Sequence, residues 1–551
     1  MTIGKIAILE KTAGCNSSAT KTIVFLLLFV ATTFLGIPQN PPSNNNPKVT
    51  QVHIEHSDSM DLKQNDNPDV YVLRGNVIFR HDSTFMYCDS AYLYSLSNSL
   101  EAFDNVHIVQ GDTLLIYGDY LNYYANTKLA KMRENVRMEN RETTLFTDSF
   151  DYDRNKNFGY YFNGGMLVDS VNELTSVYGQ YSPDTKMAFF KDSVRLVNPQ
   201  FTLTSDTLNY NTDTKIATIT GPTVIEADSG FVYSSRGWYN TVSGESMLYD
   251  RSVVVSKDKT KTITADSLAY DRTNGFVEAF GDMVVNDTAR KIIIKGNYGY
   301  YDEKTDFTFA TDSAQMIEYS QQDSTYLHAD TLLMKTIDTL REVKAYYGVR
   351  FYRIDLQGVC DSLQYNTVDS TMRLYKNPIL WNEGYQITGD TIKILFNDST
   401  IERMNVLDYA FALQEIDTTY YNQLKGKNLT AYFDAGEIYK MVVEGNGEAI
   451  YYNIDNKTAA PLELSKSAAP FITFTIKKRK IIRIKWEPDS SMNVFPIPDL
   501  KPEDKFLQGF VDYNYIRPKN KDDIFVKVTM KTEDVPPPRR VHRRSRQEQT
   551  Q

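Results

Sequence analysis

The chain of 551 residues is 41% hydrophobic and 24% charged and carries a formal net charge of −10. The negative charge argues against nucleic acid as a partner, because binding to phosphates requires a basic surface, and the mean hydropathy of −0.42 excludes a membrane protein of many helices. The 38 Tyr and 28 Phe favour strands over helices.

The N-terminal region reads as an export signal followed by a linker. The apolar run IVFLLLFVATTFLGI, residues 23–37, follows three lysines, a pattern typical of a secretory signal. We assign residues 1–37 to a signal peptide or an N-terminal anchor, and expect export to the periplasm, with attachment to the inner membrane if the signal stays uncleaved. The Pro- and Asn-rich residues that open 38–67 predict an extended linker.

Residues 68–455 repeat two short phrases. The first, ADSLAYD at residues 265–271, recurs about every 30 residues, a spacing typical of repeat proteins. We call its Asp, or the Gly or Asn that replaces it, the anchor. The second phrase, as in GNVIF at residues 75–79, has a turn-forming pair before alternating apolar residues. Polar connectors such as NTDTK at 211–215 and DRTNG at 271–275 suit hairpin turns, so each unit should hold two bent antiparallel strands.

The positions two and four residues after each anchor are mostly apolar and should face the interior. Strict alternation also places the anchor Asp266 on the same side of its strand as Leu268 and Tyr270. The candidate lining residues of an interior groove are Leu121, Tyr123, Phe150, Tyr152, Leu208, Tyr210, Leu268, Tyr270, Leu332, Met334, Leu363, Tyr365, Ile392 and Ile394.

The anchors themselves are predicted to be corner residues rather than catalytic acids. A carboxylate among core residues is a candidate functional group, but a catalytic acid is unique in its site, whereas this one is repeated. Asp, Gly and Asn accept left-handed or bulge geometry best, so each anchor should mark a change of strand direction. The predicted corner aspartates are Asp89, Asp119, Asp148, Asp206, Asp266, Asp330, Asp361 and Asp390.

The remaining reactive residues give no sign of an enzyme. Cys88 and Cys360 occupy the same small-residue position in units too far apart for a disulfide. His81, His107 and His328 are scattered and are predicted to lie on the strand surface. We find no zinc, nucleophile or phosphate-loop pattern, so no catalytic residue, metal or cofactor is expected.

The pattern changes in the last part of the chain. Residues 456–535 are predicted to be a β-rich C-terminal segment, with a basic strand pair at 471–486 and a further small β-element at 506–525. Residues 536–551, which include PPPRR, are predicted to be a disordered basic tail.

With its signal, its period and both phrases, the chain resembles the OstA-like family, which includes LptA and the N-terminal domain of LptD. The phrases at residues 265–271 and 75–77 carry the resemblance, which extends over about residues 70–452. It implies an all-β fold, an elongated repetitive β-jellyroll, whose apolar groove shields the lipid A acyl chains of lipopolysaccharide without catalysis. It also implies strand addition to related jellyroll domains of inner- and outer-membrane transport proteins, at an open edge such as the strand of Val72 and Leu73.

The apolar residues two and four positions after each anchor leave two interpretations open. Leu, Phe and Tyr can fill a dry solenoid core that binds nothing, or they can line a groove with an open edge, which would give the tyrosine hydroxyls their partners. The leading hypothesis is a periplasmic lipopolysaccharide transport protein between the two membranes. The alternatives are an envelope β-solenoid scaffold and a carbohydrate-binding protein.

Overall fold

The computed structural model describes residues 50–62, 69–320, 323–338, 340–382, 384–397, 400–417, 419–455, 460–478, 480–528 and 530–531. They all belong to one compact unit, Thr50–Gln551. The predicted signal or anchor at residues 1–37 and the predicted basic tail at 536–551 lie outside the described residues, as does part of the predicted linker. Within the described part of the chain, no helix is long and apolar enough to cross a membrane.

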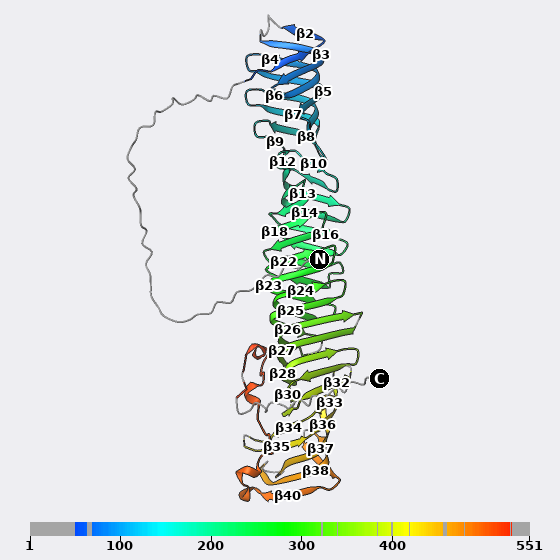
Figure 1. Ribbon diagram of the computed structural model, residues 1–551, viewed down its shortest axis with the longest axis vertical. Coiled ribbons are helices and arrows are strands. Elements are labelled where there is room, and N and C mark those ends of the chain that lie inside the picture. The colour runs from blue at the N-terminus through cyan, green and yellow to red at the C-terminus, as the bar shows by residue number, and fades with distance from the viewer. Residues whose placement is uncertain are drawn as a thin grey trace, which may run out of the picture. The chain divides into compact units, whose positions relative to one another are not determined.

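The elements are almost all strands, and their lengths change along the chain (Figure 1). The first strands are β1 (His53–His56), β2 (Ser59–Leu62), β3 (Val70–His81), β4 (Thr84–Tyr94), β5 (Ser99–Gln110), β6 (Leu114–Tyr124), β7 (Leu129–Asn140) and β8 (Thr143–Asp153). The next are β9 (Phe158–Tyr161), β10 (Gly165–Val168), β11 (Glu173–Ser176), β12 (Tyr178–Ser182), β13 (Met187–Asn198), β14 (Phe201–Asn211), β15 (Ile216–Ile219), β16 (Thr223–Ala227), β17 (Gly230–Ser234), β18 (Arg236–Asn240), β19 (Glu245–Tyr249), β20 (Val253–Ser256), β21 (Lys261–Thr264) and β22 (Ser267–Asp271).

Long strands return after β22 and shorten again before the C-terminal end. They are β23 (Phe276–Asp287), β24 (Ile292–Asp302), β25 (Phe307–Glu318), β26 (Thr325–Ile337), β27 (Leu340–Tyr352) and β28 (Leu356–Asn366). The last strands are β29 (Thr371–Tyr375), β30 (Ile379–Asn382), β31 (Tyr385–Thr388), β32 (Thr391–Asn397), β33 (Thr400–Leu407), β34 (Ala410–Glu415), β35 (Tyr421–Gly426), β36 (Asn428–Asp434), β37 (Glu437–Ile454), β38 (Pro461–Lys477), β39 (Lys480–Glu487) and β40 (Ser491–Pro496).

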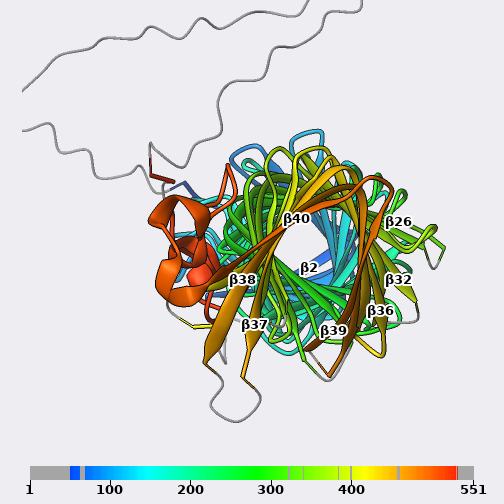
Figure 2. The same ribbon diagram turned by 90° about the horizontal axis from the view of Figure 1, so that it is seen from below.

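The described strands join one antiparallel sheet of 40 strands. Long strands pair with the next strand along the chain, as β3 does with β4 and β23 with β24. Where a strand is interrupted at the bend, its two halves pair separately, as when β14 pairs with both β15 and β16. The sheet bends over itself, and the strands surround a common interior when viewed along the stack (Figure 2). The all-β fold of repeated, bent antiparallel strands is therefore as predicted.

Each bend is a β-bulge in which two residues of one strand face a single anchor. At the first corner, Gly75 and Asn76 of β3 lie opposite Asp89 of β4, and their φ values are 76° and 44°. Asn105, in the equivalent pair of β5, donates a hydrogen bond of 2.7 Å to Asp89. Of the left-handed or bulge geometry expected at the corner, the left-handed conformation belongs to the bulged pair and not to the anchor, because the extra residue lies in that strand.

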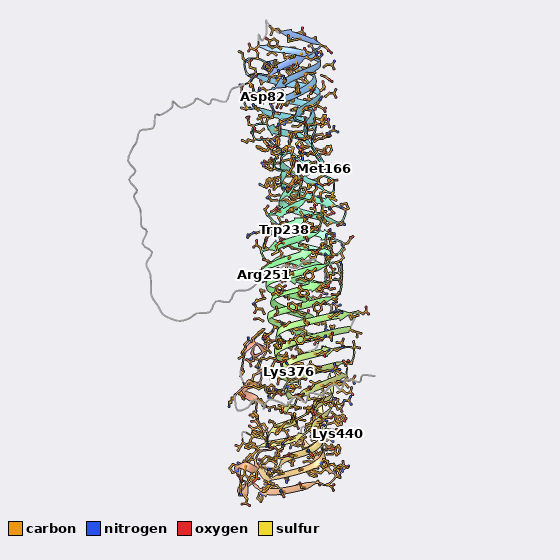
Figure 3. All side chains as sticks on the ribbon, in the orientation of Figure 1. Asp82, Met166, Trp238, Arg251, Lys376 and Lys440 are labelled. Atoms are coloured by element: carbon orange, nitrogen blue, oxygen red, sulfur yellow. The ribbon has the colours of Figure 1, made fainter. Side chains whose placement is uncertain are left out.

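Asp266 does not share a side with Leu268 and Tyr270, because the bend shifts the alternation by one residue. Ala265, Leu268 and Tyr270 are buried, whereas Asp266 is exposed. Its carboxylate accepts a hydrogen bond of 3.2 Å from Arg251, which is labelled in Figure 3. The expected inward-facing carboxylate is therefore absent at this position.

The two ends of the sheet also differ from the prediction. Residues 53–62, predicted to be linker, form β1 and β2, which both pair with β3. The strand of Val72 and Leu73 is consequently not an edge. Both strands have only four residues and exposed side chains, so their sequence carries no apolar alternation from which a strand could be recognised.

At the other end, β38 pairs with β37, β39 and β40, so the sheet continues to Pro496. Four short 3-10 helices follow: η1 (Ile497–Asp499), η2 (Pro502–Asp504), η3 (Asn514–Ile516) and η4 (Asp523–Phe525). The β-element predicted at residues 506–525 does not form. The buried residues of this segment, Leu507, Ile516 and Ile524, are eight or nine positions apart rather than two, and they pack on the outside of the sheet.

Candidate functional site

The interior between the two walls of the bent sheet brings the predicted lining residues together. Thirteen of the 14 belong to one continuous cluster of buried side chains, and Tyr365 packs against it. Leu121, Phe150 and Leu208 are fully buried, so the interior is filled with side chains in this stretch. A role of these residues toward a lipid stays a prediction.

The free rims of the bent sheet are two rows of hairpin turns. One row follows the anchor phrases and includes residues 125–128, 154–157, 183–186, 212–215 and 272–275. The other follows the second phrases and includes residues 82–83, 141–142, 169–172 and 199–200. Side chains from the two rows meet, and these contacts close the interior along one line.

We call this line of contacts the seam. Its contacts between side chains use a basic residue in almost every unit, and they lie in the turns or at the strand ends next to them. The contacts are Lys128–Asp82 at 2.7 Å, Arg154–His81 at 3.2 Å, Lys186–Asn140 at 2.8 Å, Lys215–Asp169 at 3.0 Å, Arg272–Gln200, Lys261–Asp306 at 2.6 Å and Arg341–Glu318 at 3.6 Å. In the Lys261–Asp306 contact the acid and the base have exchanged rows.

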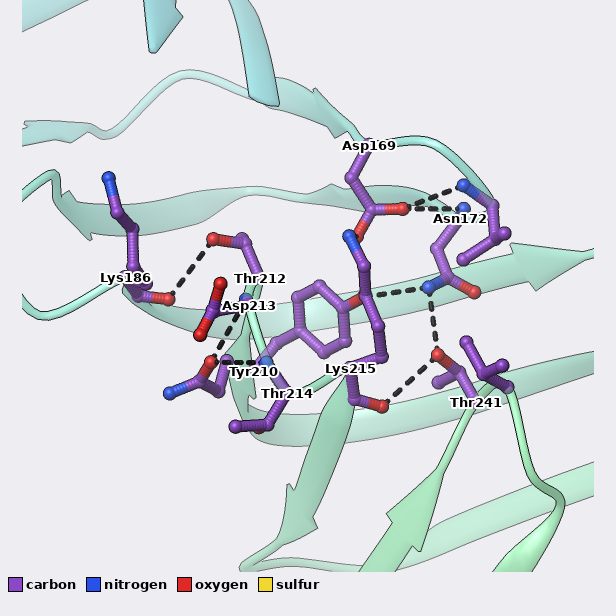
Figure 4. A network of polar contacts seen from close by, with 12 residues as sticks. Asp169, Asn172, Lys186, Tyr210, Thr212, Asp213, Thr214, Lys215 and Thr241 are labelled. Carbon is purple, nitrogen blue, oxygen red and sulfur yellow. Dashed lines mark hydrogen bonds and ion pairs between the residues drawn. The ribbon is translucent and has the colours of Figure 1, made fainter. Parts of the chain in front are cut away.

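Several inward tyrosines end at the seam, where the hydroxyls of Tyr123, Tyr152 and Tyr210 find partners. Figure 4 shows the contact around Tyr210, whose hydroxyl donates to Asp169 at 2.5 Å and accepts from Asn172 at 2.7 Å. Asn172 also donates to Thr241 at 2.9 Å. The Asp169 side chain is fully buried, and Lys215 completes its set of donors. A tyrosine here has an apolar ring in the core and a satisfied hydroxyl at the rim.

Burial and charge set the protonation states along the seam. Burial alone would raise the pKa of Asp169, but hydrogen bonds from Tyr210, from the backbone and from Lys215 hold it below its ordinary value. The pKa of Asp306 is also lowered, because Lys261 and Arg290 outweigh the effect of burial. Burial raises the pKa of Tyr123 to about 12, although Arg154 opposes the shift. The seam is therefore held by ionised carboxylates and neutral tyrosines at neutral pH.

The filled interior opens into a cavity of about 320 Å³ between β16 and β25. Its apolar walls include Ile225, Val232, Ile263 and Val277, and Tyr270 of the predicted set contributes to the lining. Its rim is charged, and the rim residues include Lys261, Arg272, Arg290, Glu303 and Asp306. The cavity thus combines an apolar interior with a rim formed by the seam.

A second cavity, of about 310 Å³, lies further along the interior and has the same organisation. Leu363 and Tyr365 of the predicted set line it, together with Met316 and Phe351. The seam pair Arg341–Glu318 lies at its edge. A cavity of ~150 Å³ lined by apolar residues can hold benzene, so either cavity has room for part of one acyl chain but not for a lipid with several chains.

The histidines and cysteines form no shared site. His81 and His328 are buried, so their predicted surface positions are wrong: His81 lies 2.6 Å from the Tyr123 hydroxyl, and the His328 ring contacts Phe525. Cys88 and Cys360 are free thiols. The described residues contain no group of three or more His, Cys, Asp or Glu that could hold a metal.

The sequence analysis missed the seam because it treated the connectors only as turns. Lys215 is the last residue of the NTDTK connector, and Arg272 is the second residue of DRTNG. A signal was present in the endings ANTK, PDTK and TDTK, at residues 125–128, 183–186 and 212–215. The recurrent basic residue at one turn position could have indicated a repeated contact.

Three comparisons place the chain beside known proteins. A comparison with curated proteins finds no match. Among solved structures, the chain is similar to the crystal structure of LptH, the LptA homologous periplasmic component of the conserved lipopolysaccharide transport device from Pseudomonas aeruginosa, at 13% identity over 30% of this chain and 79% of that chain, with a TM-score of 0.09. Residues 49–206 match the family model described as OstA-like protein. The resemblance to the OstA-like family is therefore confirmed over residues 49–206.

Proposed function

We propose that the protein is a non-enzymatic lipopolysaccharide transport protein of the periplasm, which shields lipid acyl chains inside its bent sheet. Each methylene removed from water contributes about 0.8 kcal/mol, so a chain of about a dozen carbons would cost about 10 kcal/mol to carry unprotected through water. A continuous apolar interior lowers this cost without chemistry. The OstA-like match over residues 49–206 supports the assignment.

The observation that carries the proposal is the pair of apolar cavities with charged rims. Each cavity continues the ladder of inward residues, and Tyr270, Leu363 and Tyr365 line the two spaces. An amphiphile would place an acyl segment against these residues and its polar part at the seam. The stretch around Phe150 and Leu208 is filled, and that supports the scaffold alternative for this part of the interior.

Passage of a whole lipid would require the seam to open. The seam consists of side-chain contacts in the turns and at the adjoining strand ends, so opening it breaks no backbone hydrogen bond between paired strands. A partly exposed pair such as Arg341–Glu318, with side chains 19% and 22% exposed, exchanges its partners for water more readily than a buried pair does. We infer that opening begins near the second cavity and is hardest at the buried Asp169.

The partners proposed for this function are related jellyroll domains of inner- and outer-membrane transport proteins. An open sheet edge recruits other chains by strand addition. Among the described residues, the sheet edges are β1 and β2 at one end and β39 and β40 at the other. Assembly at both ends would extend the interior toward the two membranes.

The test is site-specific photo-crosslinking in cells. A photoreactive residue at Tyr270 or Tyr365 should capture lipopolysaccharide, because these side chains line the cavities. The same residue at Ala269, which neighbours Tyr270 but faces the other side of its strand, should not capture it. A photoreactive residue at Tyr210, where the seam is closed by the contacts to Asp169 and Asn172, should capture less lipopolysaccharide than one at Tyr270.

Two results would contradict the proposal. Equal capture at Tyr270 and Ala269 would show that the lipid contacts the surface without entering the interior. Capture at none of the tyrosines, in a protein that accumulates normally, would favour the scaffold with a dry core. Leu268→Asp supplies an independent check, because a buried charge should block lipid passage if the interior is the path.

A further inference from the structure

The outer face of the sheet between β26 and β38 is covered by a segment that belongs to no strand. We call residues 505–525 the strap. It runs back along the sheet from its C-terminal end, so that Leu507 packs near β34 and β37, and Phe525 reaches His328 of β26. Figures 1 and 2 show this segment beside the sheet, on its outer face.

Two buried glutamines hold the main chain of the strap by the same two-point contact. Gln423 of β35 donates to the carbonyl of Lys505 and accepts from the amide of Leu507, both at 2.8 Å. Gln386 of β31 donates to the carbonyl of Val511 at 2.9 Å and accepts from the amide of Tyr513 at 2.8 Å. A primary amide that bonds the carbonyl of residue i and the amide of residue i+2 holds the main chain and requires no particular side chain there.

Apolar side chains of the strap fill two separate clusters on the sheet. Leu507 packs with Phe411, Leu413, Ile450, Tyr452 and Leu464. Ile516 packs with Val359, Ile379 and Trp381. The surface therefore has the parts of a peptide-binding groove: two backbone clamps and two apolar sites whose occupants are nine residues apart.

The strap can leave this groove without breaking the sheet. Residues 497–528 contain only 3-10 helices and irregular segments, so no ladder hydrogen bond depends on them. Its departure would nevertheless expose Leu507, Ile516 and both apolar clusters to water, which opposes an empty groove. Exchange for an equivalent occupant restores every contact.

We propose that the outer face of the sheet between β26 and β38 is a binding groove for a peptide with the conformation of the strap, and that the strap of a second copy of this chain can replace the strap that occupies it in cis. The strap of a second copy has the same sequence as residues 505–525, which already occupy this groove, so it can make the same contacts. The tether after Pro496 keeps the cis strap at an effective concentration on the order of 1 mM. Exchange between intact copies should therefore be rare at low concentration and frequent when one copy has lost its cis contact.

Complementary variants of the full chain provide the test. One variant, Leu507→Asp with Ile516→Asp, has a defective strap and an intact groove. The other, Gln386→Leu with Gln423→Leu, has an intact strap and weakened clamps. In the mixture, the intact strap of the second variant can bind the intact groove of the first variant, whose own defective strap no longer competes for it. Native mass spectrometry should therefore show a 1:1 complex of the two variants that is about tenfold more abundant than the dimers of either variant alone.

The controls keep the same chemistry at positions outside the contact. Val526→Asp changes an exposed residue just beyond the strap, and Gln364→Leu changes a glutamine that bonds Glu342 on the sheet instead of the strap. When either double variant is replaced by its control, the abundance of the 1:1 complex should fall to that of the dimers of a single variant. If the two folded double variants stay monomeric when mixed, the strap is a permanent part of its own chain and the proposal is wrong.

A second measurement applies if a double variant does not fold. Wild-type chains with a photoreactive residue in place of Tyr513 and wild-type chains with a heavy-isotope label can be mixed near the effective concentration of about 1 mM. Adducts between labelled and unlabelled chains, mapped to β30 or β31, support exchange. Adducts confined to single chains overturn it.

Discussion

Substitution of Asp169 by Asn should destabilise the middle of the sheet by about 3–5 kcal/mol, the cost of removing one partner of a buried ion pair. The Asp169 side chain is fully buried and accepts hydrogen bonds from the Tyr210 hydroxyl at 2.5 Å, from Lys215 at 3.0 Å and from the amides of Val171 and Asn172, both at 2.9 Å. An asparagine offers one oxygen to these four donors and leaves Lys215 without its charge partner.

The pH dependence gives a second, independent readout. The pKa of Asp169 is lowered in the folded protein, so its contribution to stability is present above its unfolded pKa of about 3.9 and is lost as the pH falls through the folded value. The difference between wild type and Asp169→Asn should therefore be full at pH 7 and shrink in acid. A difference independent of pH would refute the assignment of the stabilisation to the ionised carboxylate.

Hydrogen exchange is the suitable assay, because long repeat proteins need not unfold in a single step. Protection should fall in β10, β11 and β14, which surround Asp169, and remain unchanged in β37 and β38. Asp213→Asn, at an exposed position of the neighbouring turn (Figure 4), is the matched control and should stay within about 0.5 kcal/mol of wild type. A loss below 1 kcal/mol at Asp169 would refute the calculated magnitude.

Three other predictions follow from corners, thiols and edges. Gly281→Ala should lower the melting temperature more than Gly384→Ala, because both glycines have positive φ but a Cβ at Gly281 would lie 2.5 Å from Asp266; equal losses would contradict the close packing of the corner. Burial raises the pKa of the Cys88 thiol to about 12, so a thiol reagent at pH 8 should label it only in denaturant, and rapid labelling of the native protein would contradict its burial. Ile54→Pro should weaken strand addition at β1 while the circular dichroism spectrum stays unchanged, and undiminished partner binding would place the contact elsewhere.

The repeat could be predicted from the sequence because the period and the phrases are local signals. Leu208 and Tyr210 face inward for the reason that alternation predicts. Asp266 does not, because the bulge at the corner shifts the alternation by one residue. That shift depends on the facing residues Gly281 and Asp282 of the next strand, which a reading of one strand at a time cannot include.

The seam and the strap could not be predicted because they join residues far apart in the chain. Lys215 meets Asp169 across 46 positions, and Gln386 meets Tyr513 across 127. Hydrophobic period predicts which face of a strand is buried, but it does not identify which turn lies across from another. The buried glutamines on the outer face were the overlooked signal, since a buried amide requires hydrogen-bond partners.

Between β9 and β22 most strands stop at the bend, whereas β3–β8 and β23–β28 run through it. In the interrupted stretch, the separation of the two walls is limited by side chains such as Tyr210 and Tyr239 and by short connecting loops, with few ladder bonds crossing the corner. A change of ring size at one inward position there would alter the local diameter of the interior without changing strand register. The width of the interior is therefore adjustable one residue at a time, in the stretch where the backbone constrains it least.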